Sequence, residues 1–176
     1  MIVISIDPGL TGACSIIDHN GLRAVFDLPT MPIPGVGPAA LVKCKLDGVA
    51  FKNLLLKHCP AGESARAVIE AVGTMGGKNN AIQTQGSLLR TLGAIETVLE
   101  LLGLKPTYAH PQTWKRYFGL IESSTFGPKA TPTQMKAKSL ATARRLYPHC
   151  TEFKRARDHN RAESALLGHW MQKELA

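Results

Sequence analysis

The sequence predicts an α/β protein built on a five-stranded mixed sheet, with three antiparallel strands, then parallel strands, and helices on both faces. Three observations support this. Short apolar runs separated by turn residues fill the first 28 residues, which is typical of an antiparallel meander. From residue 47 onward, helix-like and strand-like patterns alternate, as they do where helices connect strands. The chain has 176 residues, of which 44% are hydrophobic, enough for a single domain over 1–176.

The first three strands are expected at residues 2–6, 10–18 and 22–28. The first is a continuous apolar run, as expected of a strand buried on both faces. Asn20-Gly21, between the second and third runs, is a strong signal for a two-residue hairpin loop.

The middle of the chain passes from loop to helix to strand. Residues 29–46 are rich in proline and glycine, and we expect a loop or a partly ordered excursion there. Apolar side chains at helical spacing predict a helix over 47–59, which Pro60 ends. Residues 65–73 have the apolar character of a buried strand, interrupted by a single acid, Glu70.

The second half carries most of the expected helices. Leucine and isoleucine at i, i+3 and i+4 predict a long amphipathic helix over 82–102, ended by Gly103. A glycine- and asparagine-rich stretch at 73–80 precedes this helix, and a short strand at 106–111 follows it and leads into a helix that holds Trp114. We expect a flexible loop at 120–132, and then a helix that begins at Thr133 and is ended by Pro148. A final helix begins near 158–161.

Composition narrows the function classes. No apolar run approaches the roughly 18 residues that span a bilayer, and the opening MIVISIDPG lacks a secretory signal, so we expect a cytoplasmic protein without a membrane part. Residues 1–104 hold 8 basic and 8 acidic side chains, whereas residues 105–176 hold 13 basic and 5 acidic. The net charge of +8 therefore comes from the last part of the chain, which favours a polyanionic partner such as nucleic acid, although a solvated basic surface has the same composition.

Three acidic positions stand in unusual places. Asp7 ends the first apolar strand, Glu70 interrupts a buried one, and residues 158–163 hold further acids at the start of the last helix. Each has a structural alternative: a turn cap, an ion pair and a helix-dipole partner, respectively. Taken together, they describe an oxygen-rich site suited to Mg²⁺ or Mn²⁺. Two such ions can position an attacking water and stabilise the leaving oxygen in phosphodiester hydrolysis.

The segments IDPG near the N-terminus, VIE in mid-chain and DHNRAESALL near the end resemble the RuvC-type Holliday junction resolvases, and above all their divergent phage and prophage members. The resemblance extends over roughly residues 2–172 and is poor at 29–46. It implies a ribonuclease H-like fold and a homodimer that cleaves two opposing strands of a four-way DNA junction in recombination and repair. It also implies a divalent cofactor, two Mg²⁺ ions per site, with Mn²⁺ able to substitute.

The resemblance also implies roles for individual residues. Asp7 would bridge two metal ions, Glu70 would bind one, and Glu163 matches the last acid of the family. We assign the remaining acid to Asp158 and hold two neighbours in reserve: Asn160, which has strict i−3 spacing from Glu163, and His159, which could activate water.

Two lysines would lie near the scissile phosphate. Lys115, in PQTWKRYFG, and Lys136, in TQMKAKS, match the family's positions, with Lys138 as the alternative for the second. A solvated helix face would explain the same residues without catalysis. Trp114 is expected to be a core anchor and not a platform for a base.

One departure from the family concerns the segment after Glu70. Family members often carry an aromatic residue there that wedges into the junction, whereas residues 73–78 contain none. Met75 is the apolar candidate for the wedge. Without an aromatic, we expect broader selection among flaps, forks and Y-structures.

The helix over 82–102 has apolar residues outside one stripe, namely Leu89, Ile95 and Val98. It could therefore form part of a dimer interface, or simply pack on the sheet.

Two other functions are compatible with the same sequence. The first rival is an RNA-processing nuclease of the same fold, because charge does not separate DNA from RNA. The second is a catalytically silent junction-binding protein, which Asn160 hints at.

Overall fold

The protein is described by a computed structural model, which covers residues 1–35, 37, 40–73, 82–121 and 131–175. A five-stranded sheet forms its centre, with the strand order β3-β2-β1-β6-β7. The first three strands are antiparallel neighbours, and the last two run parallel to the first, which confirms the predicted mixed sheet. The strands are β1 (Ile2–Asp7), β2 (Ala13–Asp18), β3 (Gly21–Asp27), β6 (Ala65–Glu70) and β7 (Pro106–Ala109).

The predicted hairpin is present, one residue earlier than expected. Asp18 pairs with Gly21, so His19 and Asn20 form the two-residue loop. The Asp18 carboxylate accepts a hydrogen bond of 2.8 Å from the Asn20 amide, and Gly21 has a φ of 113°. The glycine thus serves as the first residue of the third strand, where its positive φ lets the chain leave the turn.

The segment over 29–46, predicted as a loop or a partly ordered excursion, contains two elements of regular structure. Two short strands within it, β4 (Thr30–Pro32) and β5 (Cys44–Leu46), pair in antiparallel fashion. Proline is compatible with this arrangement because the two-stranded sheet has only edge strands. Leu46 is buried in the main core, and this contact fixes the far end of the excursion.

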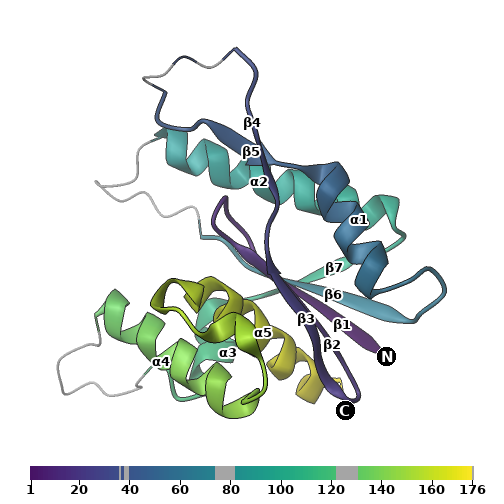
Figure 1. Cartoon of the computed structure of the whole chain (residues 1–176), viewed down its shortest axis with the longest axis vertical. Coiled ribbons are helices and arrows are strands. Elements are labelled where there is room, and N and C mark those ends of the chain that lie inside the picture. The colour runs from purple at the N-terminus through teal and green to yellow at the C-terminus, as the bar shows by residue number, and fades with distance from the viewer. Residues whose placement is uncertain (36, 38–39, 74–81, 122–130, 176) are drawn as a thin grey trace.

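Helices cover both faces of the central sheet (Figure 1). This confirms the predicted placement of helices on both faces: among the described residues, α1 and α2 lie on one face with the small sheet, and α3, α4 and α5 lie on the other. The predicted helix ends agree with the structure to within about two residues, and Gly103, with a φ of 74°, follows the end of the long helix. The helices are α1 (Gly48–His58), α2 (Ile82–Leu101), α3 (Pro111–Tyr117), α4 (Pro132–Leu146) and α5 (His159–Glu174), with 3₁₀ turns η1 (Thr151–Phe153) and η2 (Ala156–Asp158).

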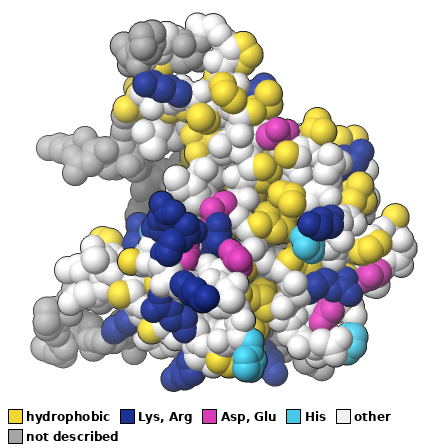
Figure 2. Space-filling view, in the orientation of Figure 1, with side chains coloured by type: hydrophobic (Ala, Val, Ile, Leu, Met, Phe, Trp, Pro, Cys, Tyr) yellow, Lys and Arg dark blue, Asp and Glu magenta, His cyan; other side chains and the backbone are white. Residues whose placement is uncertain are grey.

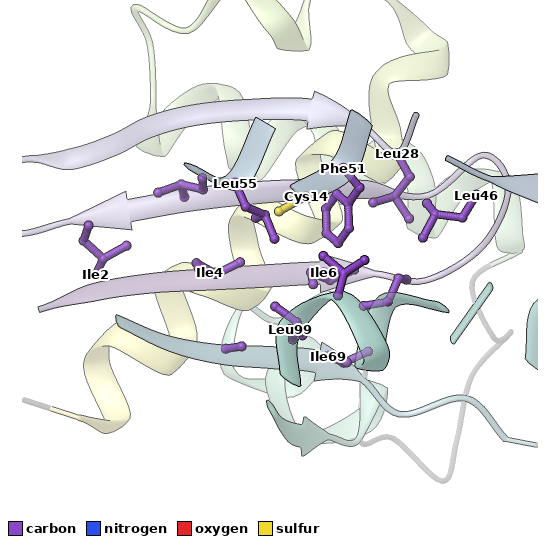
Figure 3. Packing of buried hydrophobic residues seen from close by; sticks show 14 residues of the cluster. Ile2, Ile4, Ile6, Cys14, Leu28, Leu46, Phe51, Leu55, Ile69 and Leu99 are labelled. Carbon is purple, nitrogen blue, oxygen red and sulfur yellow. The ribbon is translucent and has the colours of Figure 1, made fainter. Parts of the chain in front are cut away.

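The central strand β1 separates two hydrophobic clusters. Its even-numbered isoleucines, with Phe51 and Leu99, belong to the cluster under α1 and α2 (Figure 3). Val3, on its other side, belongs with Trp114 and Leu166 to the cluster under α3, α4 and α5. Burial on both faces explains why β1 carries apolar side chains on both of its sides, in contrast to an alternating strand.

Helix α5 is seated closely on β1 and β2. The hydroxyl oxygens of Ser5 and Ser15 lie 2.8 and 3.0 Å from the carbonyl oxygen of Ser164. A Cβ at Gly168 would lie 2.3 Å from the Ser5 hydroxyl oxygen, so only glycine allows this approach. These contacts fix how α5 is rotated about its axis and how close it lies to the sheet, and they thereby fix the position of Glu163.

The long helix α2 mainly packs on the sheet. Of the three residues proposed for a dimer interface, Ile95 and Val98 are buried in the core, whereas Leu89 is 49% exposed. Ile82, seven residues before Leu89, is also exposed. None of the helices in the described part of the chain combines the length and the apolar character needed to cross a membrane.

Candidate active site

Two acidic residues lie side by side at one edge of the central sheet. Asp7 is the last residue of β1 and Glu70 is the last residue of β6. These strands are parallel neighbours, with Ile6 beside Ile69, so both strands end at the same edge of the sheet. Ligand sites of α/β sheets commonly form at the carboxyl ends of parallel strands.

The turn after Asp7 is tight. The Gly12 amide donates a hydrogen bond of 3.0 Å to the Gly9 carbonyl oxygen, and Gly9 has a φ of 145°. A Cβ at Gly12 would lie 2.1 Å from the Asp7 carbonyl oxygen, a distance that no side chain permits. The two glycines therefore let the chain turn back close to Asp7 and enter β2.

Two helices complete the site. Glu163 comes from the second turn of α5 and Lys115 from α3. The Lys115 ammonium nitrogen lies 2.9 Å from one Glu163 carboxylate oxygen and 3.8 Å from a Glu70 oxygen. Both carboxylates are mostly buried, with 16% and 13% of their side chains exposed. One lysine thus bridges an acid of the sheet and an acid of the covering helix.

Two neutral donors hold these carboxylates in place. The Trp114 indole nitrogen donates to Glu70 at 3.2 Å, and the Ser139 hydroxyl donates to Glu163 at 3.2 Å. Trp114 is fully buried, which confirms the predicted core anchor and gives it a second role. Neither donor role was predicted from the sequence, although Trp114 directly precedes Lys115.

The acids of the site are poorly compensated. Burial raises the pKa of Asp7 well above its usual value, and the charges of Glu70 and Glu163 raise it further. Lys115 and Lys136 oppose this rise without cancelling it. Burial also raises the pKa of Glu70, against the opposing effect of Lys115. Burial alone would lower the pKa of Lys115, but Glu70 and Glu163 outweigh it and raise the pKa. Burial and mutual repulsion therefore disfavour the ionised forms of Asp7 and Glu70, and the nearby lysines offset this only in part.

The donor set suits a hard divalent cation in its chemistry. Three carboxylates from β1, β6 and α5 are the oxygen ligands that Mg²⁺ takes. In this structure, however, the carboxylates lie around a lysine and are not gathered around one point. Among the described residues, no three His, Cys, Asp or Glu side chains form a group that could hold a metal ion. Lys115 supplies the positive charge between Glu70 and Glu163.

Asp158, predicted as the remaining metal-binding acid, has different partners. It is 3% exposed, and both of its oxygens accept hydrogen bonds from Arg155. The Arg155 amide lies 2.7 Å from one oxygen, and the guanidinium Nε lies 3.0 Å from the other. Burial alone would raise the pKa of Asp158, but the hydrogen bonds from Arg155 hold it below its usual value. Asp158 is thus an internally satisfied acid that closes the turn before α5.

The two residues held in reserve also have local partners. The Asn160 side-chain amide donates to the Thr11 carbonyl oxygen at 2.5 Å, which ties the start of α5 to the turn between β1 and β2. A ring nitrogen of His159 lies 3.4 Å from the Ala156 carbonyl oxygen. Both residues line the cavity that Asp158 also lines.

The second predicted lysine faces the site from α4. Lys136 is exposed in the first turns of that helix, and its charge acts on Asp7. Lys138, the alternative, is exposed on the same helix. Met75, the predicted wedge, lies outside the described residues.

Comparisons with known proteins bear on the fold. No protein-family model and no curated protein sequence matches this chain. Among solved structures, the chain is similar to Thermus thermophilus RuvC in complex with a Holliday junction substrate, with a TM-score of 0.61 and 14% identity over 99% of this chain and 96% of that one. It is also similar to a second Thermus thermophilus RuvC structure, with a TM-score of 0.57 and 16% identity over the same shares. The fold is therefore the predicted ribonuclease H-like fold, matched from end to end.

Proposed function

We propose that this protein is a metal-dependent endonuclease that cleaves branched DNA, with the four-way junction as its preferred substrate. The observation that carries the proposal is the set of Asp7, Glu70 and Glu163 around Lys115, at the edge of a sheet whose fold matches RuvC over its whole length. The neighbouring structure holds a Holliday junction, which supports junction DNA as the ligand class here.

The proposed cofactor is Mg²⁺, two ions per site. Asp7, Glu70 and Glu163 would hold it after moving closer together around the cation, because Lys115 lies between the two glutamates in this structure. Bound there, Mg²⁺ would supply the positive charge that activates water and stabilises the departing oxygen of a phosphodiester. Asp158 was predicted to belong to this set, but Arg155 occupies both of its oxygens, so the proposal assigns it a structural role.

The chain's own residues have distinct proposed roles. Trp114 and Ser139 orient the Glu70 and Glu163 carboxylates through single hydrogen bonds. Lys115 and Lys136 place positive charge where a phosphate gains negative charge during cleavage. Their positions on α3 and α4 bring these charges to the acids from the face opposite α1 and α2.

We further propose that the active form is a homodimer. Resolution of one junction needs two cuts, and two-fold symmetry supplies two sites at a fixed distance. Ile82 and Leu89 lie two helical turns apart on α2 and are 88% and 49% exposed, so this stripe is the proposed contact.

The test is cleavage of a synthetic four-way junction in Mg²⁺, beside a linear duplex and an RNA hairpin of equal length. The expected result is a pair of symmetric, ligatable nicks in the junction, with little cleavage of the other two substrates. An Asp7→Asn preparation, purified in the same way, controls for contaminating nucleases.

Two other outcomes would replace the proposal. Cleavage of the RNA hairpin alone would establish an RNA-processing nuclease on the same fold. Junction binding without cleavage in Mg²⁺ or Mn²⁺ would establish a binding protein and direct attention to Asn160.

A further inference from the structure

The cavity lined by Asp158, His159 and Asn160 has a volume of about 700 Å³, and several basic side chains also line it. The turn between β1 and β2, the end of β3, the start of α4 and the segment before α5 form its walls. We call it the basic groove, and the residues that matter for its charge are Lys136, Arg155, Arg157, Asp158, Asp27 and Arg161. In Figure 2, Lys and Arg side chains gather beside carboxylates left of the centre of the molecule.

The basic side chains of the groove fall into two classes. Arg155 binds the buried Asp158, and Arg161 forms a two-pronged contact with Asp27, both oxygens lying 2.6 Å from its nitrogens. These two arginines are neutralised inside the protein. Lys136 and Arg157, in contrast, make no ion pair with any residue that the structure describes. Two cations are therefore available to a ligand.

Arg157 is held on a rigid support. It is the middle residue of η2, and Arg155 and Asp158 close that turn from both sides with a backbone bond of 3.1 Å and the side-chain bonds described above. Arg144 of α4 also donates to the Phe153 and Lys154 carbonyl oxygens at 2.7 Å each. The backbone beneath Arg157 is thus fixed before any ligand arrives, which lowers the entropic cost of binding.

The groove is continuous with the acidic site through Lys136. This lysine lines the groove, and its charge also acts on Asp7. Thr11, whose carbonyl oxygen accepts the Asn160 amide, forms the wall only four residues after Asp7. A polyanionic ligand that reaches the acidic site can therefore continue past Lys136 to Arg157 in the groove.

We infer that the basic groove is a subsite for the sugar–phosphate backbone of the cleaved DNA strand, in which Lys136 contacts the scissile phosphate from the end of the groove and Arg157 contacts a phosphate next to it. The inference rests on the proposed function, because it names the path of that substrate. A sugar–phosphate backbone fits because each phosphodiester carries one negative charge and binds an isolated cation without needing a base-specific partner.

The test measures binding, not cleavage, of a fluorescent four-way junction in EDTA at a series of salt concentrations. Each lost phosphate contact should reduce the slope of log K against log salt by about 0.9. Arg157→Ala and Lys136→Ala should each show this reduction, and the double variant about twice as much. Arg157→Lys, which keeps the charge, should retain most of the wild-type slope.

The matched control is Arg145→Ala. Arg145 is exposed on α4, the same helix as Lys136, but does not line the groove. It removes one charge from the same basic region and should leave the slope unchanged. Thermal unfolding of each variant checks that the fold is intact, which is expected because Lys136 and Arg157 are exposed.

The outcomes separate the subsite from the proposed function. Junction binding by the wild type with equal slopes for Arg157→Ala, Arg145→Ala and the wild type would overturn the subsite and leave the nuclease proposal standing. Equal losses in Arg157→Ala and Arg145→Ala would show a diffuse basic surface, which also overturns the subsite. Absence of junction binding by the wild type would overturn both.

Discussion

Two regions of this protein place acids beside basic side chains, and they differ in how well the acids are compensated. At the carboxylate site, Asp7, Glu70 and Glu163 share Lys115, and the pKa values of Asp7 and Glu70 are raised. At the turn before α5, Asp158 receives its own arginine, and its pKa is lowered. The two regions come close together in sequence, because Asp158 directly precedes α5 and Glu163 lies in the second turn of that helix.

The difference separates a binding site from a structural ion pair. A buried acid that only stabilises a fold is expected to have partners that favour its ionised form, as Asp158 does. Acids that remain short of positive charge reduce stability, and this cost is typical of sites that bind a cation or a reacting group. Burial alone does not separate the two cases, because Asp158 is the more buried residue in terms of exposed surface.

The substitution Asp7→Asn should produce the largest effect. We expect cleavage of a four-way junction to fall by about 10²–10³-fold, the cost of losing one source of stabilisation for developing charge, because Asp7 would hold the metal that supplies it. In EDTA, the same variant should be more stable than the wild type, by on the order of 1 kcal/mol, because a buried and repelled charge is gone. Single-turnover cleavage and urea unfolding measure the two quantities. Cleavage at the wild-type rate would contradict the assignment of Asp7.

Asp158→Asn is the matched change at the other region and should have the opposite effect on stability. It leaves Arg155 without its anion, so we expect a loss of about 1–3 kcal/mol in the free energy of unfolding at pH 7. Junction cleavage should persist, because Asp158 is assigned a structural role. Loss of cleavage with unchanged stability would return Asp158 to the metal-binding set.

The pH dependence of that loss follows from the lowered pKa of Asp158. In the unfolded chain the carboxyl takes up a proton near its ordinary pKa, about 3.9, whereas in the folded protein it does so only at lower pH. Its contribution to stability is therefore complete above about pH 5 and is lost as the pH falls through the folded pKa. Urea unfolding of the wild type and Asp158→Asn should converge in acid. A gap that stays constant down to about pH 3 would contradict the ion pair.

Lys115→Met removes the cation that the two glutamates share. Without divalent metal, we expect the free energy of unfolding to fall by about 1–2 kcal/mol, because Glu70 and Glu163 lose their charged partner. Added Mg²⁺ should raise the melting temperature of this variant more than that of the wild type, since a ligand that binds only the folded state stabilises it. Lys105→Met, at an exposed position, is the control. Equal Mg²⁺ responses in all three proteins would argue against a cation site at these acids.

The sequence allowed the sheet and two acids of the candidate site, Asp7 and Glu70, to be predicted for physical reasons that can be named, whereas Glu163 was assigned through the family resemblance. A double-sided apolar strand followed by Asp-Pro-Gly places Asp7 at a sheet edge, and a lone acid in the strand at 65–70 places Glu70 beside it. The assignment of Asp158 could not be settled in this way. Asp158 is only five residues before Glu163 in the sequence, which made it a candidate for the same site. The orientation of the Asp158 carboxylate is instead set by its hydrogen bonds from Arg155, three residues earlier.

The remaining differences have similar causes. The small sheet over 29–46 depends on Leu46 reaching the main core, a long-range contact that local proline content hides. Ser139 and Trp114 act on Glu163 and Glu70 only because α4 and α3 pack against α5 and β6. Such pairings depend on tertiary packing and leave no periodic signal in the sequence.

Trp114→Phe should give the smallest effect and tests how strictly the carboxylate site is positioned. Phenylalanine retains an aromatic ring in the core but cannot donate the 3.2 Å hydrogen bond to Glu70. We expect a loss of about 1 kcal/mol in stability, from one hydrogen bond and a small change in packing. If the Trp114 indole positions Glu70, the variant should in addition need a higher Mg²⁺ concentration for half-maximal stabilisation, since Glu70 would be free to rotate. Phe153→Leu, a fully buried change in the same core away from the acids, is the control. If both variants lose stability and neither alters the Mg²⁺ response, Trp114 is a core anchor alone. If only Trp114→Phe shifts that response, its indole nitrogen positions Glu70.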